Sequence, residues 1–401
     1  MPSRVPSSSS GSGSSPIPPA VKGLSAVSLF NDVASEMVYP LLPAFVVGTL
    51  GAGPFMLGLL DGAADLTSAA LKVVSGRLAD RPGWRRPLIL IGYATAVLVR
   101  PLIAVAGAAW QVVGFRVIDR VGKGIRTPPR DALIAAVTPE PQRGRAYGFH
   151  RGADHAGAVL GSLAAWYLLT RGVEVPRVIA WSAAPGLAAF LILAVVLRRA
   201  QGSRESAADP RMPELDASGR VFWAPMMALA AITFFRLPET LLLLRLQQRG
   251  VAVALVPLVW AGLHVVRSAS SYPGGWISDR LGPRGAISAG GLVFAAMAAT
   301  LGMGVAPAAA VLAFLVLGVV AGLTESAERA LVARLAPIRT GRGFGAYHAL
   351  TGVVALPAGL AFGALYQSIG GPGALWICAA GMLAAVGAWL LVAPSRGERD
   401  I

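Results

Sequence analysis

The segment Gly76-Arg-Leu-Ala-Asp80-Arg81-Pro-Gly83-Trp-Arg85-Arg86 returns in weaker form, 199 residues later, as Gly275-Trp-Ile-Ser-Asp279-Arg280-Leu-Gly282-Pro-Arg284. Two further landmarks repeat at nearly the same offset, because residues 132–135 match 330–333 and residues 144–148 match 341–345. Self-similarity at one offset is typical of a duplicated structural unit. The sequence therefore predicts two consecutive copies of one unit.

Long apolar stretches surround both copies of this segment. Of the 401 residues, 55% are hydrophobic and only 14% are charged, whereas about 25% are charged in a soluble domain. Stretches this long and continuous are typical of membrane-spanning helices. We predict an all-α membrane protein with twelve transmembrane helices, as two six-helix pseudo-repeats, over residues 24–47, 54–76, 88–108, 111–137, 144–169, 177–197, 221–244, 252–276, 286–304, 307–333, 343–367 and 374–394.

The placement of lysine and arginine predicts the topology. With the N-terminus in the cytoplasm, 20 basic residues lie in cytoplasmic segments and four in outer loops, which is a strong positive-inside bias. The net charge of +15 therefore indicates membrane orientation and not nucleic-acid binding. We expect a multi-pass protein of a bacterial cytoplasmic membrane with both termini inside. Its predicted parts are a disordered cytoplasmic tail (1–20), two six-helix bundles (21–198 and 221–396) and a cytoplasmic linker (199–220).

The segment 76–86 resembles the signature loop of the major facilitator superfamily, and its weaker copy and the six-plus-six helix count fit that family. The resemblance covers about residues 21–396 and implies a secondary transporter that rocks two halves around a central cavity. A narrower similarity, in residues 31–40 and 119–132, is to a bacterial subgroup of unassigned substrate. The chain departs from the family's antiporter signature at Gly161-Ser162, where that signature has Gly-Pro.

The charges of the repeated segment predict a cytoplasmic gate. An acid beside a glycine turn at a helix end can hold arginines and a neighbouring helix N-terminus in one state and release them in another. The simpler alternative is that the arginines only fix the topology. The gate residues we predict are Gly76, Asp80, Arg81, Gly83, Arg85, Arg130, Asp131, Asp279, Arg280 and Arg284.

Helix 111–137 carries an arc of positive charge. Arg116, Arg120, Lys123 and Arg126 lie on one face of it together with Asp119. Charges at membrane depth are costly and are kept for a pathway or for pairing. We predict that Arg120, Lys123 and Arg126 bind an anionic substrate, and the alternative is a network of ion pairs with Asp32, Asp61 or Asp154.

Pairs of acids on the first two helices suggest proton coupling. Asp32 and Glu36 are four residues apart on one helix face, and Asp61 and Asp65 repeat this spacing on the next helix. Two carboxylates held close together favour the sharing of a proton. We predict proton coupling at Asp32, Glu36, Asp61, Asp65 and Asp154, with neutralisation of arginines as the alternative.

Histidine and arginine supply the remaining candidates for substrate contact, which are His150, Arg151, His264 and Arg267. A histidine beside a carboxylate can relay protons or bind an anion when it is charged. A metal site is not predicted, because no third ligand lies at short spacing from His150 and Asp154. The single cysteine, Cys378, cannot form an internal disulfide.

Together these residues predict a proton-coupled secondary transporter for a small organic anion or zwitterion. One alternative is a multidrug/proton antiporter that exports lipophilic compounds, and another is a non-transporting membrane sensor. An enzyme is not expected, because nucleophile, zinc-protease and nucleotide-binding motifs are missing. We expect a monomer in the lipid bilayer that binds protons and a small molecule, with no cofactor and no nucleic-acid partner. Export is preferred over import by analogy alone.

Overall fold

The computed structural model describes residues 17–81, 83–139, 142–199, 220–335 and 340–393, and these are helical throughout apart from short connections. The predicted tail (1–20) lies outside the described residues except for its last four positions, and the predicted linker (199–220) except for its two ends. The domain boundaries drawn at these segments stay a prediction.

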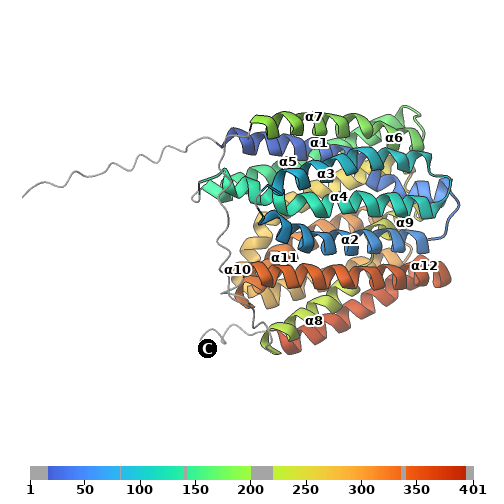
Figure 1. Cartoon of the computed structure of the whole chain (residues 1–401). Helices are drawn as coiled ribbons and strands as arrows, with labels where there is room; N and C mark the ends of the chain where they lie inside the picture. The colour runs from blue at the N-terminus through green and yellow to red at the C-terminus, as the bar shows by residue number, and fades with distance from the viewer. Residues whose placement is uncertain (1–16, 82, 140–141, 200–219, 336–339, 394–401) are drawn as a thin grey trace, which may run out of the picture.

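The first half contains six passages along one bundle (Figure 1). Several are interrupted by short 3-10 or π segments near prolines, because proline lacks the backbone donor that a regular helix needs. The elements are α1 (Pro19–Val38) with η1 (Tyr39–Leu41) and η2 (Ala44–Thr49), α2 (Phe55–Ala79), α3 (Arg85–Val99) with η3 (Arg100–Val105), α4 (Ala109–Ala136), α5 (Arg143–Thr170), and α6 (Val175–Trp181) with α7 (Ala183–Arg199).

The second half contains α8 (Arg220–Phe234) with α9 (Glu239–Gln248), η6 (Val253–Leu255), α10 (Val256–Gly302), α11 (Pro307–Leu335) and α12 (Thr340–Val392). The 47 residues of α10 would be about 70 Å long if straight, more than twice the thickness of a bilayer core. Instead α10 reverses at Gly282 (φ 73°, ψ 166°) and α12 at Gly370 (φ 76°, ψ 170°). Both therefore count as two passages, so the described residues cross the bundle twelve times, as predicted.

Equivalent glycines make equivalent contacts in the two halves. A Cβ at Gly92 would meet Arg126, and a Cβ at Gly290, 198 residues later, would meet Thr324, which is 198 residues after Arg126. Gly124 likewise packs on α2 at Ser68, and its counterpart Gly322 packs on the first passage of α10 at Ser270. The repeat found in the sequence is thus a repeat of helix packing.

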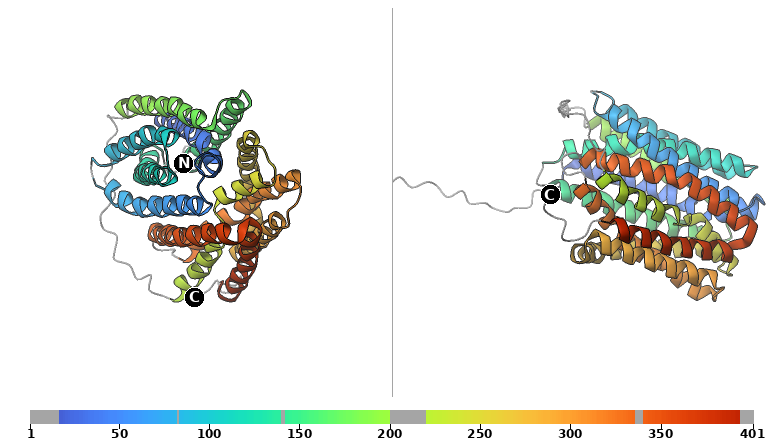
Figure 2. Two further views of the ribbon diagram at one scale, coloured as in Figure 1. Left: turned by 90° about the vertical axis from the view of Figure 1, so that its right-hand side faces the viewer. Right: turned by 90° about the horizontal axis from the view of Figure 1, so that it is seen from below.

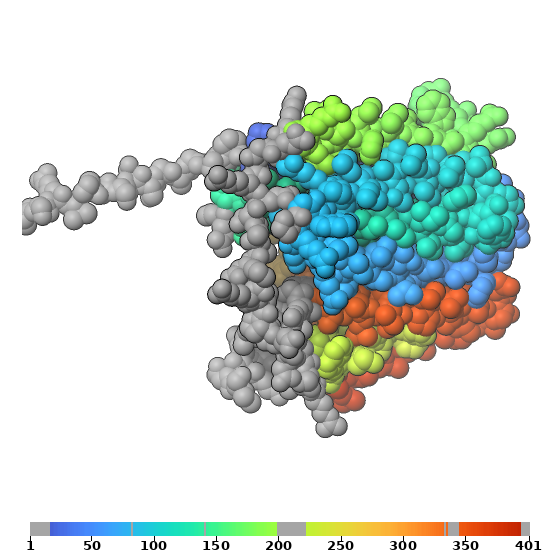
Figure 3. Space-filling model, viewed as in Figure 1, coloured from blue at the N-terminus to red at the C-terminus, as the bar shows by residue number. Residues whose placement is uncertain are grey.

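The helices run nearly side by side, and the first half packs against the second along a seam where α2 meets α12 and α5 meets α10 (Figures 1 and 2). In the space-filling view the blue and green surface of the first half borders the orange surface of α12 along this seam (Figure 3).

We name the two ends of the bundle by their landmarks. The motif end, at the left in Figure 1, holds the turn between α2 and α3, the start of α1 and the end of α12, and the opposite end holds the turn at Gly370.

Six helical segments in the described residues are long and apolar enough to cross a membrane by length and composition. Two of these, Val253–Gly302 and Gly345–Val392, contain the reversals at Gly282 and Gly370. α1, α2, α4 and α5 are not among the six although they have 20 to 28 residues. They carry most of the interior charges of the first half, which lowers their hydropathy, so the most polar helices are those that build the candidate site.

Candidate functional site

Asp119 is the centre of a buried ion-pair network inside the first half. Its carboxylate accepts hydrogen bonds from Arg100 (2.9 Å) and Arg116 (3.4 Å), and all three side chains are almost completely buried. Arg100 also donates to the backbone oxygen of Asn31 on α1, and the guanidinium of Arg116 lies 4.9 Å from the ring centroid of Tyr39. This network ties α1, η3 and α4 together, so its role is structural.

Arg126, which we predicted to bind substrate, also lies in the packing between helices. It is 4% exposed, donates to the backbone oxygen of Gly92 (3.2 Å) and lies over the ring of Tyr93. The absent side chain of Gly92 gives the Arg126 stem room against α3. In this conformation the guanidinium is therefore engaged between α3 and α4, and a role of Arg126 in substrate binding stays a prediction.

Arg120 and Lys123 on α4 differ from these arginines. Neither forms an ion pair with a described carboxylate, and the Nε of Arg120 is buried without a hydrogen-bond partner among the described residues. Lys72 on α2 is close enough for its charge to act on both of them. Among the described residues no direct ion pair joins Arg120 or Lys123 to Asp32, Asp61 or Asp154, although Asp32 lies within electrostatic reach of Lys123, so the alternative of a charge network stays open. Three cations thus share one interior region in which carboxylates lie nearby but no described carboxylate forms a direct ion pair with them.

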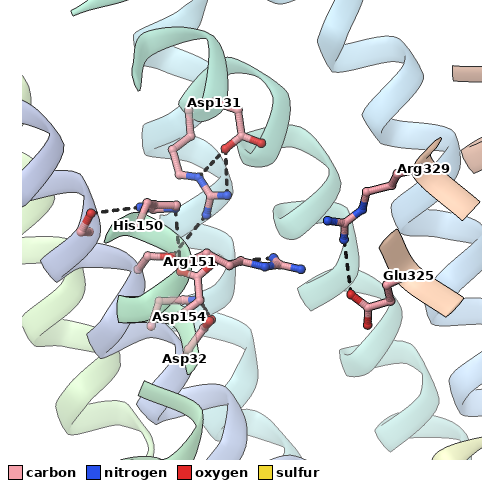
Figure 4. Close-up of polar contacts among 11 residues, drawn as sticks. Asp32, Asp131, His150, Arg151, Asp154, Glu325 and Arg329 are labelled. Atoms are coloured by element: carbon pink, nitrogen blue, oxygen red, sulfur yellow. Dashed lines mark hydrogen bonds and ion pairs between the residues drawn. The ribbon is translucent and has the colours of Figure 1, made fainter. Parts of the chain in front are cut away.

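The acidic and basic residues of α5 form a cluster with α1 on the inner face of the first half (Figure 4). Asp154 lies 3.8 Å from both His150 and Arg151, and His150 lies 3.3 Å from the hydroxyl of Ser25. Asp32 accepts a hydrogen bond from Asn31 and is within electrostatic reach of Asp154, Lys123 and Glu36. The structure therefore brings together predicted proton-coupling and substrate residues from α1, α4 and α5.

Asp61 connects the two halves at the opposite end. It accepts hydrogen bonds from the Tyr39 hydroxyl (3.2 Å), from the Thr240 hydroxyl (2.7 Å) and from the Thr240 backbone N–H (3.2 Å). Thr240 lies on α9 in the second half, and its donors replace the water that a carboxylate would otherwise bind. The side chain of Asp65, one turn further along α2, forms no hydrogen bond or ion pair with another described residue.

Glu36 forms a second connection of this kind. It accepts a hydrogen bond from the indole N–H of Trp260 (2.8 Å) and lies 3.8 Å from His264, both on α10. Tyr39 and Trp260 also pack against each other, with ring centroids 5.1 Å apart. Two carboxylates of the first half are thus held by donors of the second half.

The remaining charges of the second half mostly pair within that half. Arg267, predicted as a substrate residue, donates to Glu239 (2.9 Å), and Arg236 donates to Glu328 (2.7 Å). Glu325 and Arg329 on α11 pair at 3.3 Å while remaining about half exposed. Figure 4 shows Arg151 of α5 pointing towards this Glu325–Arg329 pair.

The contacts between the halves indicate which end is closed. Between described residues they involve the opposite-end parts of α1, α2, α9 and α10, and Gln367 near Phe55. Towards the motif end, by contrast, the side chain of Arg151 is 60% exposed and that of Arg329 59% exposed. Charged side chains at this depth face a water-filled cavity and not lipid. The molecule is therefore closed at the opposite end and open towards the motif end.

The predicted gate residues lie at the motif end but do not form the predicted latch in this conformation. Asp80 is exposed, and its side chain forms no hydrogen bond or ion pair with another described residue. Arg85 donates to the backbone oxygen of Ala79, and Arg130 pairs with its neighbour Asp131 (2.9 Å).

In the second copy, Arg280 stacks on Trp276 and Arg284 donates to the backbone of Leu390. Gly83 has φ 80°, which explains the glycine in this turn. The gate stays a prediction.

Sequence reasoning missed several residues of the site. Thr240, Tyr39 and Trp260 carry no signal of their own, because hydroxyls and indoles are common in membrane helices. Lys72 did carry a signal, since the chain has only three lysines and two of them, Lys72 and Lys123, lie at membrane depth. Within the described residues, no group of three His, Cys, Asp or Glu side chains could hold a metal ion.

Comparisons with known proteins agree with this architecture. The family model of the Major Facilitator Superfamily matches residues 24–266. An uncharacterized MFS-type transporter of Methanocaldococcus jannaschii is 26% identical over 354 residues, covering 86% of this chain and 87% of that protein. The chain belongs to the Major Facilitator Superfamily and is a multi-pass membrane protein of the transporter class.

Two further similarities are to a solved transporter structure and, over part of the chain, to a multidrug resistance protein. A bacterial homolog of the human lysosomal transporter Spinster, in an inward-facing and occupied conformation, has a TM-score of 0.73 and 15% identity, with 93% of this chain and 96% of that chain covered. Multidrug resistance protein MdtH of Edwardsiella ictaluri is 32% identical, but over only 133 residues, or 33% of each chain. Neither similarity identifies what this chain transports.

Proposed function

We propose that this protein is a proton-coupled secondary transporter that carries a small organic anion or zwitterion by alternating access. The observation that carries the proposal is the interior group of Lys72, Arg120 and Lys123, which has no ion-pair partner among the described carboxylates. Cations at membrane depth are costly, so they are kept where they line a pathway or where a ligand forms the ion pair that the protein does not supply. Guanidinium and ammonium groups bind carboxylate and phosphate well.

The proposed coupling uses the carboxylates that join the halves. Asp61 and Glu36 accept hydrogen bonds from Thr240 and Trp260, so the closed opposite end depends on their acceptor oxygens. A proton bound to either carboxylate weakens it as an acceptor and favours separation of the halves at that end. Asp32 and Asp154, which face the cations, are the proposed link between proton and substrate.

The proposed orientation places the motif end in the cytoplasm of a bacterial cell, because the basic residues of the loops gather at that end. The cavity then opens inward. Both described ends of the chain, near residues 17 and 393, lie at the same end of the bundle (Figure 1).

Export of lipophilic drugs is the second candidate, and the partial match to MdtH favours it. Sites for such compounds are lined predominantly by apolar and aromatic side chains. An interior in which three cations form no direct ion pair with a described carboxylate is less favourable for lipophilic cations than for anions, so the first candidate has more support.

A thermal-shift screen of the purified protein tests the choice. The panel contains organic acids, sugar phosphates, amino acids and lipophilic cations, and a ligand at 100 times its Kd stabilises by about 2.7 kcal/mol. We expect anionic or zwitterionic ligands to raise the melting temperature, and the Arg120→Gln/Lys123→Gln variant to lose this response. Arg177→Gln, which removes an exposed cation at the opposite end, is the matched control. Stabilisation by lipophilic cations alone would contradict the proposal.

A further inference from the structure

A small polar pocket lies on the seam between the halves, where α2 and α12 separate. Its volume is about 220 Å³, and its wall comes from α2, α8 and α12. Six of its nine lining residues have polar side chains, and the lining residues are Asp65, Ser68, Ala69, Lys72, Thr233, His348, Thr351, Gly352 and Ala355.

The floor of the pocket is formed by the closest approach of the two helices. From the opposite end inwards, α2 and α12 meet at Gly58 and Gly359, then at Gly62 and Ala355, then at Ala69 and Gly352. A side chain at Gly352 would collide with the Ala69 methyl group. The pocket lies beside this contact, because Ala69 and Gly352 belong to its lining, and it extends from there towards Lys72 and His348 on the side of the motif end.

Two opposite charges lie on the α2 wall without partners. Asp65 and Lys72 are seven residues apart, which places them on the same helix face about 10 Å apart along the axis. Neither forms a hydrogen bond or ion pair between its side chain and another described residue. An acid and a base that line one pocket without forming an ion pair with each other suit a ligand that has both charges.

The opposing wall adds donors from the second half. His348 and Thr351 on α12 and Thr233 on α8 line it. His348 is exposed, and the hydroxyl of Thr351 donates to the backbone oxygen of Tyr347, which leaves its lone pairs free to accept. Together with Lys72, and with Arg120 and Lys123 within electrostatic reach, His348 makes one end of the pocket favourable for an anionic group.

We propose that this pocket binds a small zwitterion, with the carboxylate or phosphonate between Lys72 and His348 and the amino group at Asp65. The inference rests on the proposed transport function and narrows its substrate class. The volume supports a small molecule, because pockets for drug-sized ligands measure about 300–1,000 Å³. Since the ligand touches α2 and α12, its binding also draws the two halves together at the motif end.

Matched probe pairs test the inference. The probes are 4-aminobutyrate with butyrate, 6-aminohexanoate with hexanoate, and 2-aminoethylphosphonate with ethylphosphonate, and binding to the full-length protein in detergent is measured by calorimetry. For at least one pair we expect the amino compound to bind ten times more tightly than its partner. Asp65→Asn should reduce this ratio to about 1, and Lys72→Gln should abolish binding of both members. Glu174→Gln, an exposed acid at the opposite end, is the control that should change neither value.

The possible outcomes separate this inference from the proposed function. If the wild type binds both members of each pair equally, or if Asp65→Asn leaves the ratio unchanged, the zwitterion site is wrong while anion binding stands. If the wild type binds no member of any pair, the zwitterion site is wrong, and the proposed function is contradicted as well if no anionic or zwitterionic ligand stabilises the protein in the thermal-shift panel. The melting temperature of each variant shows whether it is folded.

Discussion

Neighbouring charges on α4 have different roles because successive side chains point about 100° apart. Asp119 faces Arg100 and Arg116 and is fully paired, whereas Arg120 has no acidic partner among the described residues. The sequence shows both as charges at membrane depth and does not separate them. The partners of Asp119 come from η3 and from α4 itself, and the register of η3 against α4 is set by packing that no local pattern predicts.

Replacing Asp119 should destabilise the protein without a direct effect on the cavity. In Asp119→Ala two buried arginines lose their shared carboxylate, and breaking such a pair costs about 3–5 kcal/mol. We expect a clearly lower melting temperature or loss of folded protein on size-exclusion chromatography. Glu174→Ala, which disrupts an exposed pair with Arg177, should leave the melting temperature unchanged. An unchanged Asp119→Ala protein would mean that the network is not structural.

The candidate site could be predicted from the sequence in part. Charge at membrane depth pointed to Asp32, Asp61, Arg120 and Lys123, all of which face the interior or the seam. The same signal also pointed to Arg126, which lies over the ring of Tyr93, and charge alone does not predict whether such a residue lines a cavity or forms a buried cation–π contact. Thr240 was not predicted, since its role depends on α9 meeting α2 across the seam.

The helices were predicted more completely than the site. All twelve predicted stretches overlap helical passages of the structure, because the bilayer requires long apolar helices. The tight reversals at Gly282 and Gly370 were not predicted. At each of them a single glycine with positive φ turns the chain where a longer loop was expected. Only the backbone conformation reveals that these glycines turn the chain.

Glycines also set how closely α2 approaches α12. In Gly58→Ala the new methyl group would lie 2.1 Å from the backbone oxygen of Gly359, which requires the helices to move apart. Overpacking of this kind costs about 1–3 kcal/mol, and here it opposes only the conformation with a closed opposite end. We expect slower transport and greater reactivity of a cysteine placed at Gly53 towards an impermeant maleimide.

Gly114→Ala provides the matched control for this prediction. Gly114 lies in α4, and nothing is within 4 Å of a Cβ at that position. Its transport rate and labelling should equal those of the parent protein. If Gly58→Ala behaves in the same way, close packing of α2 against α12 does not limit closure.

At the scale of the whole molecule, the seam predicts which covalent link blocks transport. A Cβ at Gly53 would lie 2.5 Å from the side-chain oxygen of Gln367, so the two halves are in contact here. A Gly53→Cys/Gln367→Cys pair should form a disulfide that holds the opposite end closed. We expect oxidation to stop transport in proteoliposomes and reduction to restore it, with each single cysteine variant as control. Cys378 is completely buried and need not be removed. Full activity of the oxidised pair would show that this end does not open.

Proton coupling belongs to the same scale, because it links a local bond to movement of the halves. Asp61→Asn retains an acceptor oxygen for Thr240 but removes the group that gains and loses a proton. Exchange of substrate across the membrane needs only the alternation of the loaded carrier, whereas accumulation against a gradient needs the proton step. We therefore expect Asp61→Asn and Glu36→Gln to keep counterflow within about threefold of the wild type while ΔpH-driven accumulation falls at least tenfold.

Thr240→Val separates coupling from simple contact at this position. This variant loses the 2.7 Å hydrogen bond to Asp61 but leaves the carboxylate able to bind a proton. It should weaken closure of the opposite end and change the rate of transport, yet still permit accumulation driven by ΔpH. If Asp61→Asn and Thr240→Val instead lose accumulation equally, the contact matters and not the proton. If Asp61→Asn and Glu36→Gln accumulate substrate as well as the wild type, the coupling proton binds elsewhere, and Asp32 and Asp154 beside Lys123 become the groups to test.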